Sequence, residues 1–224
     1  MAHYIINGKE LIDMKMDNRY RRDHEMAYFS DESVMAEQLV TKKAIREYNT
    51  VMPFEVEKGM ECLNRTGMKH GKNVYFEPPF HCEYGSHIEV GENFYANTGC
   101  IMLDVAKITI GKNVLFGPNV SIYTAGHPIH PDSRNSGYEY GIAVTLGDNV
   151  WIGGSCVILP GVRIGNNAVI GAGSVVTRDI PDIVCAAGNP CKVIREITEA
   201  DRPFYYKDRR FDDEVWEKIC KASV

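Results

Sequence analysis

The 224-residue sequence has no stretch of 18 consecutive apolar residues, and its first residues do not combine a basic segment with an apolar run. These absences argue against a membrane-spanning helix and against a secretory signal peptide. The seven cysteines are irregularly spaced, odd in number and without a CxxC pair, which fits neither a disulfide framework nor a structural zinc site. We therefore expect a cytoplasmic protein with no membrane partner.

Positive charge is also scarce. Lysine and arginine total 25 against 30 acidic residues, a formal net charge of -5. Nucleic-acid binding draws on clustered lysine and arginine, and the short run Arg19 to Arg22 does not supply such a cluster. Apolar residues at 44% and charged residues at 25% are typical of a folded chain. The composition thus predicts one core or one repeat array, with no nucleic acid as partner.

A six-residue repeat is the main feature that is present. Its first positions run without interruption through Leu146, Ile152, Ile158, Ile164, Ile170 and Val176. An earlier block places Val90, Ala96 and Met102 in phase and then, after a two-residue slip, Ile110, Phe116 and Ile122. A period of six matches neither a helix nor a strand, so it indicates a solenoid of short strands whose stacked coils bury the first residue of each unit.

The repeat divides the chain into three parts. We expect a helical cap over residues 1–70, a β-helix over 71–190 with a protruding loop at 125–143, and a tail with a short helix over 191–224. The cap prediction uses Met35, Leu39, Ile45 and Tyr48 at helical spacing, and the terminal helix should begin near Asp212 or Asp213. A loop this long on a rigid solenoid is usually functional. If each coil has 18 residues, Cys82 and Cys100 should stack as neighbours in the core.

Four segments carry a resemblance to a known family: YGSHIEVGENFYANTGCIMLD, GPNVSIYTAGHPIH, NVWIGGSCVILPGVRIGNNAVIGAGSVVTRDIP and AAGNPCKVIREI. With them the sequence resembles the galactoside and maltose O-acetyltransferases of the hexapeptide-repeat superfamily. The resemblance implies a mainly-β fold, a left-handed parallel β-helix with three hexapeptides per coil. It also implies a homotrimer with sites between subunits, acetyl-CoA as co-substrate and a sugar hydroxyl as acceptor.

The resemblance also assigns roles to residues. His127 in TAGHP matches the catalytic histidine, and an imidazole, with its ordinary pKa of about 6.5, suits a general base at neutral pH; His130 should be structural. The acceptor-binding positions are Asp13, Glu83, Asn97 and Asp104. Galactoside-type members have serine where this chain has Glu83, which favours a maltose-like or other glucosyl acceptor. They also have a second aspartate after Asp104, so the acceptor contact there falls on Val105.

The donor side follows the same resemblance. The positions that match the CoA-binding residues are Trp151, Gly154, Ala172, Thr177, Arg178, Lys192 and Arg195. Cations suit the phosphates of CoA, and the backbone of a solenoid can pair with its extended arm. Gly154 departs from a serine in some members, so oxyanion stabilisation there must come from a backbone N–H or water.

Three alternative functions remain open from the sequence. Acetyl transfer to the amine of an amino sugar would use similar residues. A γ-type carbonic anhydrase would need three histidines around zinc, whereas His81 and His87 are six residues apart and His127 and His130 have no obvious third partner. A non-enzymatic scaffold would be favoured only if CoA did not bind. We therefore predict no metal.

Overall fold

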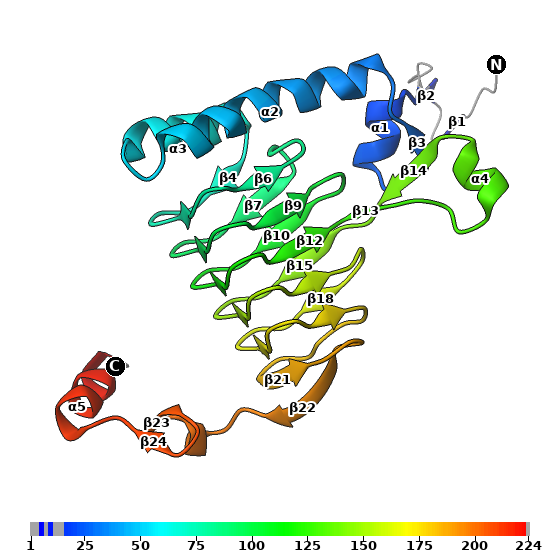
Figure 1. Ribbon diagram of the computed structural model, residues 1–224. Coiled ribbons are helices and arrows are strands. Elements are labelled where there is room, and N and C mark those ends of the chain that lie inside the picture. The colour runs from blue at the N-terminus through cyan, green and yellow to red at the C-terminus, as the bar shows by residue number, and fades with distance from the viewer. Residues whose placement is uncertain (1–4, 7–8, 11–15, 223–224) are drawn as a thin grey trace.

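The chain forms a three-sided solenoid of short parallel strands with a helical cap at one end (Figure 1). The computed structural model describes residues 5–6, 9–10 and 16–222. Face 1 contains β4 (Lys69–His70), β7 (Ile88–Val90), β10 (Ile108–Ile110), β15 (Val144–Leu146) and β18 (Arg163–Ile164). Face 2 contains β5 (Tyr75–Phe76), β8 (Tyr95–Ala96), β11 (Leu115–Phe116), β16 (Trp151–Ile152), β19 (Val169–Ile170), β21 (Val184–Ala187) and the antiparallel β22 (Lys192–Glu196). Face 3 contains β6 (His81–Cys82), β9 (Ile101–Leu103), β12 (Ser121–Tyr123), β17 (Val157–Ile158) and β20 (Val175–Val176). The predicted parallel β-helix is confirmed.

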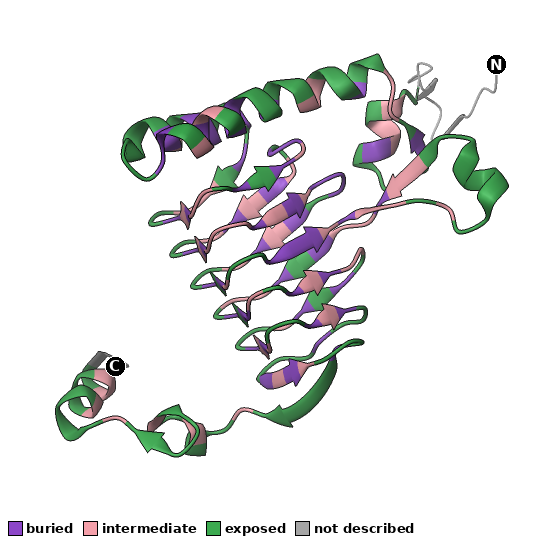
Figure 2. Ribbon diagram, in the orientation of Figure 1, coloured by how far each residue is buried: buried purple, intermediate pink, exposed green. Residues whose placement is uncertain are grey.

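The first positions of the repeat point into the core, as expected. All twelve are buried, and the two-residue slip after Met102 is present. Figure 2 shows this alternation of buried and exposed residues along each coil. Near the cap the core is aromatic: the rings of Phe76 and Phe94 lie 5.1 Å apart, and so do those of Phe94 and Phe116. In the later coils the same positions hold isoleucine and valine, so the core narrows along the solenoid.

Coil length explains the slip. Tyr95 pairs with Leu115 in the next coil, a step of 20 residues, whereas Trp151 pairs with Val169, a step of 18. The two extra residues of the upper coils lie where face 3 turns into face 1, which we call the 3–1 edge. The predicted neighbours Cys82 and Cys100 are therefore wrong. Cys82 lies beside Met102, because the first coils are longer than the 18 residues assumed.

The turn from face 1 to face 2 carries a ladder of asparagines. Asn73, Asn93, Asn113, Asn149 and Asn167 all have φ between 55° and 58°. Each side-chain amide donates to the next asparagine in the series at 2.9 to 3.0 Å. Asparagine tolerates this left-handed conformation better than other residues with a Cβ, so it both forms the turn and links successive coils.

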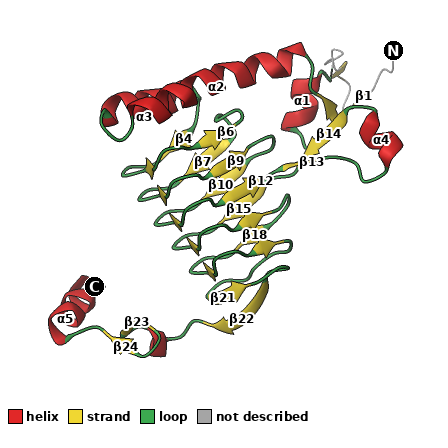
Figure 3. Ribbon diagram, viewed as in Figure 1, coloured by secondary structure: helices red, strands yellow, loops and turns green. Residues whose placement is uncertain are grey.

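The first coil is covered by α1 (Asn18–Asp23), α2 (Glu32–Val51) and α3 (Val56–Arg65), with β3 (Tyr28–Phe29) between the first two (Figure 3). Asp31 caps α2, because its carboxylate accepts hydrogen bonds from the backbone N–H groups of Ser33 and Val34. Of the four residues used to predict this helix, Ile45 and Tyr48 are buried. Met35 and Leu39 are about half exposed, so the face that packs on the solenoid is centred elsewhere than predicted.

The two ends of the chain carry small elements. β1 (Ile5–Ile6) pairs with β2 (Lys9–Glu10) near the N-terminus. After β22 come a 3₁₀ helix (Glu199–Asp201), β23 (Phe204–Tyr206), β24 (Arg209–Arg210) and α5 (Asp213–Ala222), which extend away from the solenoid (Figure 1). Asp212 accepts a hydrogen bond from the N–H of Val215, so the predicted start of α5 is confirmed. No helix in the described part of the chain is long and apolar enough to cross a membrane.

Candidate active site

The segment predicted as a loop is a structured arm at the 3–1 edge. It contains β13 (Ala125–Gly126), α4 (Pro131–Asn135) and β14 (Tyr138–Gly141). β14 pairs antiparallel with β13 and with β3 of the N-terminal segment. The sequence showed no partner for this segment in its own coil; the partner is β3, about 110 residues earlier in the chain. This pairing holds the arm against the cap.

His127 follows β13 on this arm, and its side chain is 59% exposed. Its Nε2 lies 4.0 Å from Oε2 of Glu139, which projects from β14 and is 21% exposed. That separation is too long for a hydrogen bond but close enough for the carboxylate to stabilise a positive charge on the imidazole. Sequence reasoning missed Glu139. The signal was the alternation in YEY, which sets the central residue on the opposite side of a strand from the two tyrosines.

The backbone after His127 is fixed by the rest of the arm. Arg134 Nη1 donates to the carbonyl oxygens of Pro128 at 3.2 Å and Ile129 at 2.8 Å. His130 caps α4, since its Nδ1 accepts from the N–H of Asp132 at 3.3 Å, in agreement with the structural role predicted for it. An exposed histidine is thus held on a short, braced turn.

A small buried cluster supports the arm from below. Tyr28, Val34, Tyr84 and Val105 are at most 4% exposed and pack with Ala125 at the start of the arm. Tyr28 pairs in register with Glu139. Burial, with the charge of Glu139 as a secondary cause, raises the pKa of Tyr28, so its hydroxyl stays protonated beside that carboxylate. Val105, the predicted acceptor contact, is therefore part of the base of the arm.

Asp104 and Glu83 lie together at the 3–1 edge. Asp104 is fully buried, and its Oδ1 accepts from the backbone N–H groups of Glu83 at 2.8 Å and Tyr84 at 3.0 Å. Its Oδ2 has no hydrogen-bond partner among the described residues, and burial raises the pKa of Asp104 to about 7. The Glu83 carboxylate accepts from Gln38 Nε2 at 2.7 Å. In this chain Asp104 therefore holds the turn that presents Glu83.

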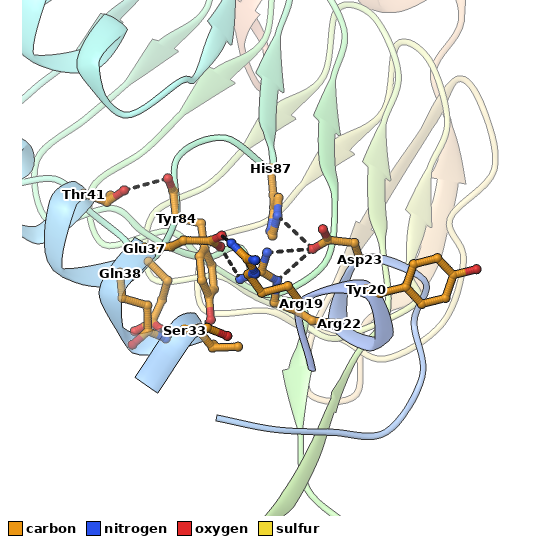
Figure 4. Close-up of polar contacts among 12 residues, drawn as sticks. Arg19, Tyr20, Arg22, Asp23, Ser33, Glu37, Gln38, Thr41, Tyr84 and His87 are labelled. Carbon is orange, nitrogen blue, oxygen red and sulfur yellow. Dashed lines mark hydrogen bonds and ion pairs between the residues drawn. The ribbon is translucent and has the colours of Figure 1, made fainter. Parts of the chain in front are cut away.

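Arg22 ties the cap to the same edge (Figure 4). Its guanidinium is 3% exposed, binds Asp23 at 2.8 Å and Glu37 at 2.7 Å, and lies over the ring of Tyr84 at 4.3 Å. His87 stacks on the other side of this group, with its Nδ1 2.7 Å from the carbonyl oxygen of Asp104. Burial lowers the pKa of His87. A buried arginine with two carboxylates fixes the N-terminal segment where β3 meets the arm.

The other predicted positions lie mainly on a different edge, where face 2 turns into face 3. We call this the 2–3 edge. Asn97 follows β8 there, and its Oδ1 accepts from the N–H of Thr98 at 2.8 Å. Gly154 and Ala172 follow β16 and β19 at the same turn in later coils, and the Gly154 carbonyl accepts from the N–H of Gly173. Trp151, 55% exposed, points outward from face 2 beside them. Asn97 and these donor-side residues thus share one edge.

The remaining donor-side residues surround the end of the solenoid. Thr177 and Arg178 follow β20 and are exposed, and Lys192 and Arg195 belong to β22. Arg195 forms a two-bond ion pair with Asp201, both contacts at 2.8 Å. Asp13 lies outside the described residues. Among the residues that the structure describes, no three His, Cys, Asp or Glu side chains are grouped as a metal site.

The predicted site residues are therefore divided between two edges. His127, Glu139, Glu83 and Asp104 lie at the 3–1 edge, whereas Asn97, Gly154 and Ala172 lie at the 2–3 edge, with face 3 between them. A base and a donor site on opposite borders of one sheet cannot act on the same molecule within one chain unless a second chain brings them together.

A parallel solenoid of hexapeptides with a histidine-bearing arm defines the class of hexapeptide-repeat transferases. The family model "Bacterial transferase hexapeptide (six repeats)" matches residues 143–178. Galactoside O-acetyltransferase of Escherichia coli K12 is 44% identical over 206 residues, which cover 91% of this chain and all of the relative. A maltose O-acetyltransferase structure from Clostridium difficile 630 has 49% identity and a TM-score of 0.80, covering 82% of this chain and 99% of that one. A galactoside acetyltransferase in complex with coenzyme A has 42% identity and a TM-score of 0.84, covering 89% of this chain and all of that one.

The chain belongs to the galactoside and maltose O-acetyltransferase family of hexapeptide-repeat acyltransferases. The resemblance drawn from the sequence motifs is thereby confirmed.

Proposed function

We propose that this protein transfers the acetyl group of acetyl-CoA to a hydroxyl of a sugar, with His127 as the general base. The observation that carries the proposal is the exposed His127 beside Glu139, on a braced arm of a chain that aligns over its length with sugar O-acetyltransferases. Glu83, in place of the serine of galactoside-type members, favours a glucose- or maltose-like acceptor.

In the proposed reaction His127 accepts the proton of the sugar hydroxyl while the hydroxyl oxygen bonds to the acetyl carbon. The carbon–sulfur bond then breaks, and His127 returns the proton to the departing CoA thiolate. Glu139 lowers the energy of this sequence, because its carboxylate lies 4.0 Å from the imidazole that carries the transient positive charge. Both oxygen and sulfur end the cycle neutral, and the enzyme is regenerated.

Binding of acetyl-CoA along the 2–3 edge is proposed for Trp151, Gly154, Ala172, Thr177, Arg178, Lys192 and Arg195. Small residues at the turns let an extended chain approach the solenoid backbone. The exposed cations at the end of the solenoid suit phosphate groups. Arg195 would act in one of two ways: through its free edge, or after exchange of Asp201 for a phosphate.

We further propose a homotrimer in which the arm of one subunit meets the 2–3 edge of the next. The outward side chains of face 2 include Tyr75, Tyr95, Leu115, Trp151 and Val169, whereas those of face 1 include Glu89, Thr109, Thr145 and Arg163. Leu115 and Trp151 are about half exposed in the single chain. Burying the apolar face against a neighbour is favourable, and it would reunite the two halves of the site.

The proposal is tested by incubating the purified protein with acetyl-CoA and a panel of glucose, maltose, galactosides and amino sugars, with release of CoA thiol and product mass as readouts. An acetyl ester on a neutral sugar is the expected product. Transfer to the amine alone would instead establish the N-acetyltransferase alternative, and absence of both acetyl-CoA binding and transfer would contradict the proposal.

A further inference from the structure

A cavity of about 500 Å³ lies between α2 and face 3, next to the 3–1 edge. Glu83, one of the proposed acceptor residues, lines it. Three basic side chains, Lys42, Arg46 and His81, line it as well. Lys42 and Arg46 are four residues apart and thus on one side of α2. All three are exposed to solvent.

Hydrogen bonds hold α2 over this cavity on both sides of the two cations. On one side Gln38 Nε2 donates to Glu83 at 2.7 Å, and Thr41 Oγ1 donates to the carbonyl of Tyr84 at 2.7 Å. On the other side the Asn49 side chain exchanges two hydrogen bonds with the backbone of Phe80, at 2.8 and 2.9 Å. Lys42 and Arg46 therefore project from a fixed segment of helix.

The two cations have no acidic partner. Neighbouring arginines do: Arg22 pairs with Glu37 and Arg65 with Glu47. Within the described part of the chain neither Lys42 nor Arg46 forms an ion pair. Glu83 is the only acid among the described residues lining the cavity, and its Oε2 is already bonded to Gln38. The cavity thus has unpaired positive charge beside a proposed acceptor residue.

We propose that the acceptor of this enzyme is an anionic sugar, whose phosphate or carboxylate group binds to Lys42 and Arg46. This rests on the proposed function. A guanidinium and an ammonium together match the oxygens of such a group, whereas a neutral sugar leaves both cations unused. Glu83, which repels the anion, would face the uncharged hydroxyls and accept hydrogen bonds from them.

The test compares kcat/KM for glucose, glucose 6-phosphate and glucuronate with saturating acetyl-CoA. At least one anionic sugar should exceed glucose by roughly tenfold or more, and the preferred one identifies phosphate or carboxylate as the recognised group. In the double variant Lys42→Met, Arg46→Gln the ratio of anionic to neutral kcat/KM should fall by roughly 10- to 100-fold, the worth of one or two charged hydrogen bonds. Lys43→Met, exposed on the same helix but outside the cavity, is the matched control and should keep the ratio.

Equal kcat/KM for all three sugars, or an unchanged ratio in the double variant, would overturn the inference. Calorimetric titration of glucose 6-phosphate and glucuronate into the protein gives a second readout that needs no turnover. If no acceptor is acetylated yet an anionic sugar binds the wild type and not the double variant, the proposed function fails while the anion site stands. If neutral sugars are acetylated and neither anionic sugar binds, the inference alone fails.

Discussion

His127 Nε2 and Glu139 Oε2 lie 4.0 Å apart across the hairpin of β13 and β14. The strand pairing sets this distance, because Gly126 pairs with Tyr140 one residue before His127 and one residue after Glu139. A Cβ on Gly126 would lie 2.5 Å from the ring of Tyr140. The absence of a side chain at Gly126 thus lets the hairpin close and bring base and carboxylate together.

Replacement of His127 by alanine should lower kcat by roughly 10² to 10⁴, the usual contribution of a general base. Folding and acetyl-CoA affinity should hardly change, since the side chain is 59% exposed and lies outside the solenoid core. Steady-state kinetics at saturating acetyl-CoA and sugar, with a thermal melt, measure both. A variant with near wild-type kcat would show that His127 is not the base, and an unfolded variant would give it a structural role.

Replacement of Glu139 by glutamine should lower kcat by roughly 5- to 10-fold. Two charges 4 Å apart interact by about 1 kcal/mol in a water-like environment, and 1.4 kcal/mol corresponds to a factor of ten. The comparison is Asp132→Asn, which removes an exposed carboxylate from the same arm, 3.8 Å from His130. Equal kcat for the two variants would leave Glu139 without a role in catalysis.

Asp104 should make folding stability depend on pH near neutrality. Burial raises its pKa from 3.8 to about 7, so between these values the folded state binds more protons than the unfolded state. Stability therefore falls as pH rises from about 4 through 7 and then levels off. In Asp104→Asn, where the amide oxygen can still accept from Glu83 and Tyr84, this dependence should vanish. Urea unfolding at pH 5, 6, 7 and 8 should show the variant gaining stability relative to wild type, by a few kcal/mol in total; a constant difference would contradict the assignment.

The asparagine ladder predicts a graded response at Asn113. Asn113→Ala loses two ladder hydrogen bonds and places a Cβ residue at φ 56°, so it should destabilise the protein by roughly 1–3 kcal/mol. Asn113→Gly loses the same bonds without the conformational cost and should be the more stable of the two. Denaturant titration of both variants separates the terms. Equal stability of the alanine and glycine variants would mean that the left-handed turn imposes no cost.

Leu115→Lys places a charge in the exposed apolar column of face 2. If this face packs against a neighbouring subunit, the variant should sediment as a monomer and lose most of its transferase activity, while circular dichroism stays native. The control Thr109→Lys changes the outward position of the polar face 1 and should remain a trimer. A wild-type protein that is monomeric by light scattering at micromolar concentration would remove the basis of this prediction.

The sequence by itself determined the solenoid, because a residue at the first position of each hexapeptide has only one way to be buried. From Leu146 to Val176 each such position enters the core, and the slip after Met102 is a real lengthening of the coil. His127 was predictable for a related reason, since a histidine in a long interruption of a rigid repeat needs a purpose other than packing. The hand of the coil came from the family resemblance, because hydrophobic periodicity is the same for either hand.

Only the tertiary structure decided which side chains surround His127. Glu139 comes close through pairing of β14 with both β13 and β3, and contacts between segments more than 100 residues apart leave no local periodicity. The error at Cys82 has the same origin, because coil length depends on how the 3–1 edge folds. The division of the predicted residues between two edges also follows from counting strands around the solenoid. A one-dimensional repeat specifies burial at each position, whereas the closure of each turn in space specifies which positions meet.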